Sequence, residues 1–256
     1  MAFPNFPNKY NEKPLLKAKD FWDYKKKIGK IPNIDPPIGV ILCYSPTLLS
    51  YILNNYDVKK IDHVVGNFFY VLEEKGIKIG VCGGFGIGGS IVGLLIEELT
   101  AFGIKKYISI GVAGSLQSDL KLGSIIVCNK AIRDEGVSHH YLQPEKYAYP
   151  SESLTKRLVN AIKKLNIDYI KGSTWTIDAP YRETTAEVKH YQKEGVLTVE
   201  MEAASLFAVA QHLNVEAGAI LTISDYLSEK VWELHFHLTE EHLKILFLIA
   251  KNTLMK

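Results

Sequence analysis

Short apolar runs alternate with longer segments of helical spacing along most of the chain. The apolar runs span residues 38–44, 77–82, 107–115, 124–132, 174–178, 196–200 and 217–225. Segments with helical spacing lie at residues 47–56, 90–102, 151–165 and 185–193, directly after Glu200, and at residues 239–254. Continuous apolar runs of this length favour buried strands, and strands that alternate with helices are typical of α/β proteins. The pattern therefore predicts an α/β fold with a mixed, largely parallel central sheet.

The first 37 residues do not follow this pattern. They are rich in proline, lysine and asparagine, contain one short amphipathic piece at residues 21–28, and end at a pair of prolines. We expect residues 1–37 to form an N-terminal arm and residues 38–256 to form a single domain, in which no sequence repeat or linker is visible. The run Lys25–Lys27 in the arm is typical of a solvated face.

Composition narrows the class of protein. With 256 residues, 47% of them hydrophobic, the chain can bury one large core, and a net charge of +2 is too small to indicate a nucleic-acid-binding surface. Cys43, Cys82 and Cys128 lie in apolar runs without a CxxC neighbour, which predicts core residues in a reducing compartment. The sequence has neither a signal-peptide core nor a run of about 18 apolar residues. We expect a cytoplasmic protein that binds neither nucleic acid nor a membrane.

The stretch GGFGIGGS follows a predicted strand and precedes a predicted helix, which is the setting of a dinucleotide-binding fingerprint. Gly84, Gly86 and Gly89 satisfy its GxGxxG spacing. About 20 residues further on, where the fingerprint needs an acid for the ribose, the chain reads KKYISIGVAG and has none. We therefore expect no nicotinamide site, and a dehydrogenase is a distant alternative. The glycines still indicate a close backbone approach, beside a helix N-terminus that can receive an anion.

Carboxylates gather where predicted strands end, and open α/β sheets bind their ligands there. Glu200 and Glu202 stand at the start of an apolar helix, and the positive end of that helix explains one acid better than two. Asp225 follows the strand AILTIS, where it could be a helix N-cap or, partly desolvated, a general acid. Together the three acids suit cleavage of a glycosidic bond. The GxSxG of lipases and the GxxxxGK of P-loop proteins are absent, so acyl transfer and nucleoside triphosphate hydrolysis lose support.

Several motifs resemble the nucleoside phosphorylase and nucleosidase family, which includes uridine phosphorylase, the hexameric purine nucleoside phosphorylases and the adenosylhomocysteine nucleosidases. They are FGIGG, SIGVAGSLQSDLKLGSIIV, AIRDEGVSHHY, TIDAPYRET, VEMEAA and TISD, and the resemblance covers about residues 38–250. It implies a three-layer α/β/α sandwich around a mixed sheet, assembled as dimers or as trimers of dimers. VEMEAA with a downstream SD is the specific combination, and the SD, which uridine phosphorylases lack, points to a purine.

The resemblance also implies roles for individual residues. Met201 and Glu202, with Glu200 beside them, would contact the ribose, and Glu202 would do so through the 2′ and 3′ hydroxyls. Asp225 would be catalytic, because it matches the aspartate that protonates or hydrogen-bonds a purine at N7. With these assignments, the two glutamates at the helix start would together hold the sugar.

The family's phosphate-binding arginines are replaced here by Ser109 and Leu48, and its serine or threonine by Val112. A phosphate dianion needs charged or N–H partners. The candidate partners are glycine turns and basic side chains: Gly86, Gly89, Gly111 and Arg133, with Arg182, His139, His140 or a basic residue of a neighbour's arm as alternatives. The glutamate with which nucleosidases activate water is absent from CYSPTL as well. The departures therefore do not decide between phosphorolysis and hydrolysis.

The base-stacking position, two residues after Asp178, holds Pro180, so Tyr181 or Trp175 is the candidate for the aromatic wall. The adjacent histidines of RDEGVSHHY point to opposite faces of an extended segment, so we expect a loop that lines the pocket and no metal site.

We therefore expect a nucleoside phosphorylase that cleaves the N-glycosidic bond of a purine nucleoside with phosphate, giving the free base and ribose 1-phosphate. It would use phosphate as co-substrate, need no cofactor, and form a homo-oligomer. Hydrolysis of the same bond by water is the closest alternative. A nucleoside-binding protein without catalysis is another, because the missing arginines permit it.

Overall fold

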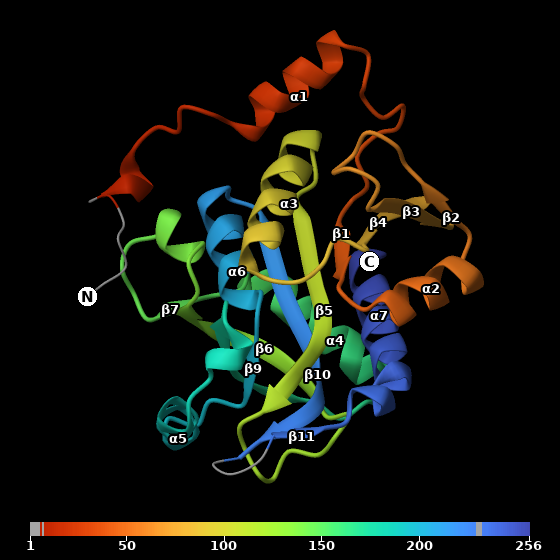
Figure 1. Cartoon of the computed structure of the whole chain (residues 1–256). Coiled ribbons are helices and arrows are strands. Elements are labelled where there is room, and N and C mark those ends of the chain that lie inside the picture. Colours follow the sequence, from red (N-terminus) through yellow and green to blue (C-terminus); the bar gives the residue numbers. More distant parts are fainter. Residues whose placement is uncertain (1–5, 7, 229–231) are drawn as a thin grey trace.

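The computed structural model describes residue 6, residues 8–228 and residues 232–256 (Figure 1). Residues 1–5 and 7 of the predicted arm, and residues 229–231, lie outside this part. The strands are β1 (Val40–Cys43), β2 (Val58–Lys60), β3 (Phe69–Glu74), β4 (Ile77–Gly83), β5 (Lys106–Ser115), β6 (Ile125–Asp134), β7 (Tyr147–Ala148), β8 (Ile170–Ile177), β9 (Thr198–Glu200), β10 (Glu216–Leu227) and β11 (Trp232–Leu234). The α-helices are α1 (Ala18–Lys27), α2 (Pro46–Asn55), α3 (Gly89–Phe102), α4 (Glu152–Lys164), α5 (Thr185–Lys193), α6 (Ala203–His212) and α7 (Glu240–Leu254). Short 3-10 turns are η1 (Lys9–Asn11), η2 (Ser138–His140), η3 (Pro180–Arg182) and η4 (Phe236–Leu238).

The strands form one mixed sheet, part of which closes on itself. Its order is β11-β10-β6-β8-β9-β5-β1-β4-β3-β2, and β10 also pairs with β5. As a result β5, β9, β8, β6 and β10 form a ring, in which β5 and β10 run parallel while β9 runs antiparallel to β5. The ring brings the carboxyl ends of β5 and β10 together with the short strand β9.

Helices cover both faces of the sheet (Figure 1). One apolar cluster joins the sheet to α3 and α6, and a second joins its other face to α2, α4 and α7. A third, smaller cluster lies under α5. The α/β fold predicted from the sequence, with three layers and a mixed sheet, is confirmed. Within the described ranges, no helix is both long and apolar enough to cross a membrane.

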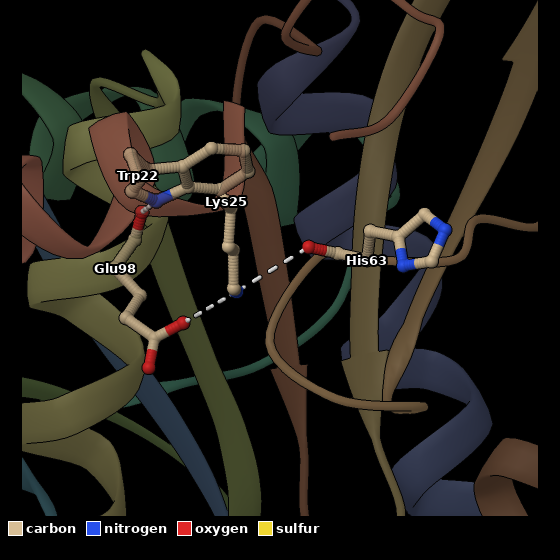
Figure 2. A network of polar contacts seen from close by, with 4 residues as sticks. All are labelled: Trp22, Lys25, His63 and Glu98. Atoms are coloured by element: carbon tan, nitrogen blue, oxygen red, sulfur yellow. Dashed lines mark hydrogen bonds and ion pairs between the residues drawn. The ribbon is translucent and has the colours of Figure 1, made fainter. Parts of the chain in front are cut away.

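The described part of the N-terminal segment docks on α3 (Figure 2). The indole N–H of Trp22 in α1 donates to the main-chain oxygen of Glu98 at 2.7 Å. The ammonium of Lys25 lies 3.4 Å from a carboxylate oxygen of Glu98 and 3.4 Å from the main-chain oxygen of His63. Lys25 is therefore an anchor and not part of the solvated face predicted for Lys25–Lys27, whereas its two lysine neighbours are exposed.

The residues before β4 form a hairpin that the apolar pattern does not reveal. β3 pairs antiparallel with β4, and the turn between them is made by Lys75 and Gly76, which have φ angles of +54° and +78°. Two left-handed residues in a row are the geometry of a tight hairpin turn. The apolar run that precedes this turn, residues 68–72, is short and ends at the exposed Glu73, and the sequence analysis does not assign it to a strand.

Candidate active site

A cavity of about 500 Å³ opens where β5, β9 and β10 meet. Its walls come from the second halves of β5 and β10 and from the turn between β9 and α6, and its rim comes from η3, the start of α5 and β11. In Figure 1 this is the end of β5 that lies near β11 and α5. The hydroxyl, carboxyl and thioether side chains along it are Tyr44, Ser109, Tyr181, Glu183, Thr185, Glu200, Met201, Glu202, Ser224, Asp225 and Ser228. The size and the mixed lining are typical of a small-molecule site.

A β-bulge places Asp225 in this cavity. The register between β10 and β5 shifts between Ile223 and Asp225, which leaves Ser224 as the extra residue. One carboxylate oxygen of Asp225 accepts the Ser224 hydroxyl at 2.5 Å, and the other accepts the indole N–H of Trp232 at 2.6 Å. A Cβ at Gly114 would lie 3.0 Å from Asp225 Oδ2, so glycine makes room for the carboxylate. Because β10 continues past Asp225, this residue does not cap a helix.

Glu200 lies at the cavity wall, but its oxygens are held by the start of α6. Oε1 accepts the hydroxyl of Thr176 at 2.5 Å, and Oε2 accepts the main-chain N–H groups of Glu202 and Ala203, both at 2.8 Å. These N–H groups are the unpaired donors at the positive end of a helix. Burial raises the pKa of Glu200, while these hydrogen bonds oppose the rise. Glu200 thus shapes the turn that carries its neighbours.

Glu202 is the N-cap residue of α6 and is 8% exposed. Its Oε1 accepts the main-chain N–H of Gly88, at 2.5 Å, from the glycine turn before α3. Burial, and then the charge of Glu200, raise the pKa of Glu202 well above the ordinary carboxyl range. The glycine turn therefore positions a cavity acid through its backbone.

The predicted phosphate partners are only partly at the cavity. Gly111 lines it, next to Tyr44 and Ser109, whose hydroxyl oxygens lie 3.1 Å apart. Gly86 is not among the lining residues, and Gly89 packs on α6, where a Cβ would lie 2.3 Å from Ser205 Oγ. Among the residues described, those that line the cavity include no lysine, arginine or histidine.

Arg133 lies away from the cavity and holds a loop together. Its guanidinium donates to Ser138 Oγ at 2.9 Å, to Ser138 O at 2.9 Å, to Gln143 O at 2.6 Å and to Leu142 O at 3.3 Å. With these four contacts made inside residues 133–143, we leave Arg133 out of the proposed phosphate site. Sequence reasoning could not distinguish this use of an arginine from an anion contact.

The rest of this loop is bonded in the same way. Glu135 accepts the N–H groups of Val137 and Ser138 and the hydroxyl of Ser205, and His139 Nε2 lies 3.0 Å from the main-chain oxygen of Arg133. The loop does not line the cavity, contrary to the expectation from RDEGVSHHY. In the part of the chain that the structure describes, no group of three or more His, Cys, Asp or Glu side chains could hold a metal ion.

Of the two aromatic residues predicted to stack on a base, only one lies at the cavity. Tyr181 lines it and is 88% exposed. Trp175 is fully buried in the cluster under α5, and its indole N–H donates to Asp134 at 2.9 Å. Trp175 points into the core because β8 is covered there by α5. Trp232, at the rim, is an aromatic residue that the sequence analysis did not single out.

Glu183 is a further lining residue missed at the sequence level. It is the acid of TIDAPYRET and directly precedes Thr184, the N-cap of α5, whose side chain accepts the N–H of Glu187. From the sequence, an acid just before a capped helix is expected to be a surface residue. Glu183 lines the cavity because β10 lies close to it. The sequence signal that could have identified Glu183 is its place in the motif TIDAPYRET.

Residues 39–247 match the model of the phosphorylase superfamily, and this range contains all the residues that line the cavity. A purine nucleoside phosphorylase of DeoD type from Caldanaerobacter subterraneus subsp. tengcongensis is 33% identical over 193 residues, which cover 73% of this chain and 82% of that relative. A protein of the same name from Xenorhabdus nematophila is 29% identical over 205 residues, covering 77% and 86%. A guanosine phosphorylase of Halorubrum lacusprofundi is 32% identical over 142 residues, covering 56% and 59%.

Proposed function

We propose a reaction for this chain, which belongs to the phosphorylase superfamily. It cleaves the N-glycosidic bond of a purine nucleoside with phosphate and releases the free base and ribose 1-phosphate. The family resemblance predicted from the motifs is confirmed by the family match. The observation that carries the proposal is that Met201, Glu202 and Asp225 line one cavity. Relatives named purine nucleoside phosphorylase and guanosine phosphorylase support the reaction and the purine.

The ribose would lie against the turn between β9 and α6. Glu202 would accept hydrogen bonds from the 2′ and 3′ hydroxyls, and Met201 would pack on the sugar ring. The transition state of such a cleavage resembles an oxocarbenium ion, whose positive charge a buried carboxylate stabilises. The N–H of Gly88 fixes the Glu202 carboxyl before substrate arrives. Glu200 would act on the sugar only through this turn, because its own oxygens are engaged.

The base would lie between Tyr181 at the rim and Asp225 at the bulge of β10. Ser224 and Trp232 fix the Asp225 carboxylate, which can then accept a hydrogen bond from an N–H group of the base. Aromatic side chains favour flat ligands, so Tyr181 and the Trp232 indole suit a purine.

Phosphate would enter near Gly111, where the hydroxyls of Tyr44 and Ser109 are within reach. Two hydroxyls do not balance a dianion in an acidic cavity, and a cation from a second copy of the chain would complete the site. The homo-oligomer, as dimer or trimer of dimers, therefore remains a prediction, as does the cytoplasmic location.

Hydrolysis by water is the second candidate function. The observation that favours it is the acid-rich lining, with no basic side chain among the described residues that form it. A carboxylate can activate water, whereas it repels phosphate. The alternative keeps the same roles for Glu202 and Asp225.

Product analysis separates these functions. Purified protein is incubated with inosine, guanosine, adenosine or uridine, each with and without phosphate, and bases and sugars are resolved by chromatography. Phosphate-dependent release of a purine with ribose 1-phosphate is the expected result. Free ribose formed without phosphate would instead establish a nucleosidase, and binding of nucleoside without any product would leave a binding protein.

A further inference from the structure

A purine base leaves with negative charge on its ring unless a proton reaches it, so a group that holds a proton near neutral pH must lie beside the base. The titratable side chains that line the described cavity are Tyr44, Tyr181, Glu183, Glu200, Glu202 and Asp225. What each of them already contacts decides which one can deliver a proton.

Asp225, the family's expected proton donor, is placed to accept. Its two oxygens receive the Ser224 hydroxyl at 2.5 Å and the Trp232 indole N–H at 2.6 Å. An indole N–H can only donate, so the oxygen it meets must be an acceptor. Asp225 therefore presents a fixed acceptor at the base end of the cavity.

The other candidates are engaged elsewhere. Glu200 holds the start of α6, and Glu202 is fixed by Gly88 at the sugar end. The Tyr44 hydroxyl lies 3.1 Å from Ser109 Oγ, and burial raises its pKa well above its ordinary value. Tyr181 is 88% exposed, so its hydroxyl proton meets solvent.

Glu183 remains, and its position fits the task. It lies between η3 and α5, lines the cavity together with Asp225, and is partly buried. No described residue donates a hydrogen bond to its carboxyl group. Among the described residues, the charged groups that act on it are two acids, Asp225 from β10 and Glu187 from α5. Burial first, and then these two charges, raise the pKa of Glu183 to about 7.

We propose that Glu183 is the catalytic acid that delivers a proton to the departing base, with Asp225 as the acceptor that orients the base next to it. The assignment rests on the proposed cleavage. The bond from C1′ to the base nitrogen breaks and its electron pair stays with the base, while the Glu183 proton moves to N7. A phosphate oxygen forms the new bond to C1′. HPO4²⁻ loses its proton on becoming the ribose ester, and a proton returned to Glu183 completes the cycle.

The test compares Glu183→Gln with wild type on guanosine and on 7-methylguanosine, whose cationic base needs no proton at N7 to leave. For guanosine, we expect kcat/KM to fall about 10²- to 10³-fold, the usual contribution of a general acid. For 7-methylguanosine, the fall should stay below about fivefold. Wild-type kcat/KM for guanosine should also decline as pH rises through about 7, where Glu183 loses its proton, and the variant should lack this decline. The matched control is Glu233→Gln, an exposed acid on β11 that does not line the cavity.

Equal losses on the two substrates would mean that Glu183 binds nucleoside, and would overturn the proposal. Wild-type activity of Glu183→Gln alongside an inactive Asp225→Asn would also overturn it and return the acid to Asp225. If wild type rejects 7-methylguanosine, 4-nitrophenyl riboside, whose phenolate leaves without a proton, takes its place. A wild type that cleaves no nucleoside in any condition refutes the proposed function itself, and this is seen before any variant is compared.

Discussion

Arg133 and Glu202 are almost equally inaccessible, at 6% and 8% exposure, but their surroundings differ. The guanidinium of Arg133 makes four hydrogen bonds to oxygens of its own loop, within ten residues along the chain. The carboxyl of Glu202 accepts an N–H from Gly88, a residue distant in sequence, and a main-chain hydrogen bond from the neighbouring Met201, and it lines a cavity of about 500 Å³. The Arg133 guanidinium therefore stabilises its own loop, whereas the Glu202 carboxyl has fewer such contacts and faces the cavity.

This difference identifies the functional charge better than burial or residue type does. Burying a charged group lowers the stability of the fold unless the group is fully hydrogen-bonded. A buried charged group with few hydrogen bonds therefore indicates a functional site, where the fold is less stable than it could be. The acids of the cavity include Glu183 and Glu202, whose pKa values are raised by burial and by neighbouring acids. Substitutions in the two regions should accordingly have opposite consequences for stability and activity.

The largest expected effect is on stability, in Arg133→Met. Removing the guanidinium leaves the buried Ser138 hydroxyl and carbonyl, and the carbonyl oxygens of Leu142 and Gln143, without this donor, and we expect the free energy of unfolding to drop by about 3–4 kcal/mol. For a chain of this size the melting temperature should fall by roughly 6–16 °C. Urea and thermal unfolding measure both, and Arg182→Met, at an exposed position, is the control with a change of about 0.5 kcal/mol or less.

The folded fraction of Arg133→Met should keep its kcat/KM for nucleoside and its KM for phosphate within about twofold, because the side chain is outside the cavity. A KM for phosphate that rises tenfold or more would mean that Arg133 contributes to the anion site, as Glu202 is proposed to contribute to the sugar site.

Glu202→Gln should lower the activity without lowering the stability. Losing the carboxyl that binds the ribose hydroxyls should lower kcat/KM about 10²-fold, or about 2.7 kcal/mol in transition-state free energy. The amide oxygen can still accept the Gly88 N–H, and an uncharged group replaces a buried acid, so the free energy of unfolding at pH 7 should be unchanged or higher. Steady-state kinetics and urea unfolding on the same preparation test this. A loss of stability as large as that of Arg133→Met, with activity retained, would make Glu202 a structural residue.

Local sequence patterns revealed most of the fold but only part of the site. Runs such as 107–115 and 217–225 become β5 and β10 because a continuous apolar strand must be buried on both faces. The closure of the ring depends on pairings between strands distant in sequence, which no local pattern encodes. Strand β3, and with it the hairpin to β4, was not predicted from the short apolar run at residues 68–72.

The residues of the site also fall into two groups, those that a motif predicts and those that no local pattern predicts. The resemblance of VEMEAA and SD to the family's motifs predicts Met201, Glu202 and Asp225 as site residues, and all three line the cavity. Trp175 and Arg133 could not be placed, since their direction depends on α5 and on residues 138–143 folding back over them. The bulge at Ser224, which aims Asp225, has no signature in the letters TISD.

The last expected effect is gradual, a pH dependence of stability that separates the two regions. A carboxyl whose pKa is raised in the folded state holds its proton there while the unfolded chain has already lost it, so the free energy of unfolding falls as pH rises from the ordinary carboxyl range toward the raised value. The slope for one such group is at most about 1.4 kcal/mol per pH unit. Urea unfolding between about pH 5.5 and 8 should therefore show wild type losing stability relative to Glu202→Gln as pH rises. Asp168→Asn, at an exposed acid for which no ion pair is described, should keep a constant difference from wild type. A wild type that gains on Glu202→Gln as pH rises would mean that Glu202 is satisfied as a carboxylate, like the charges of the loop, and would remove the physical reason for treating the two regions differently.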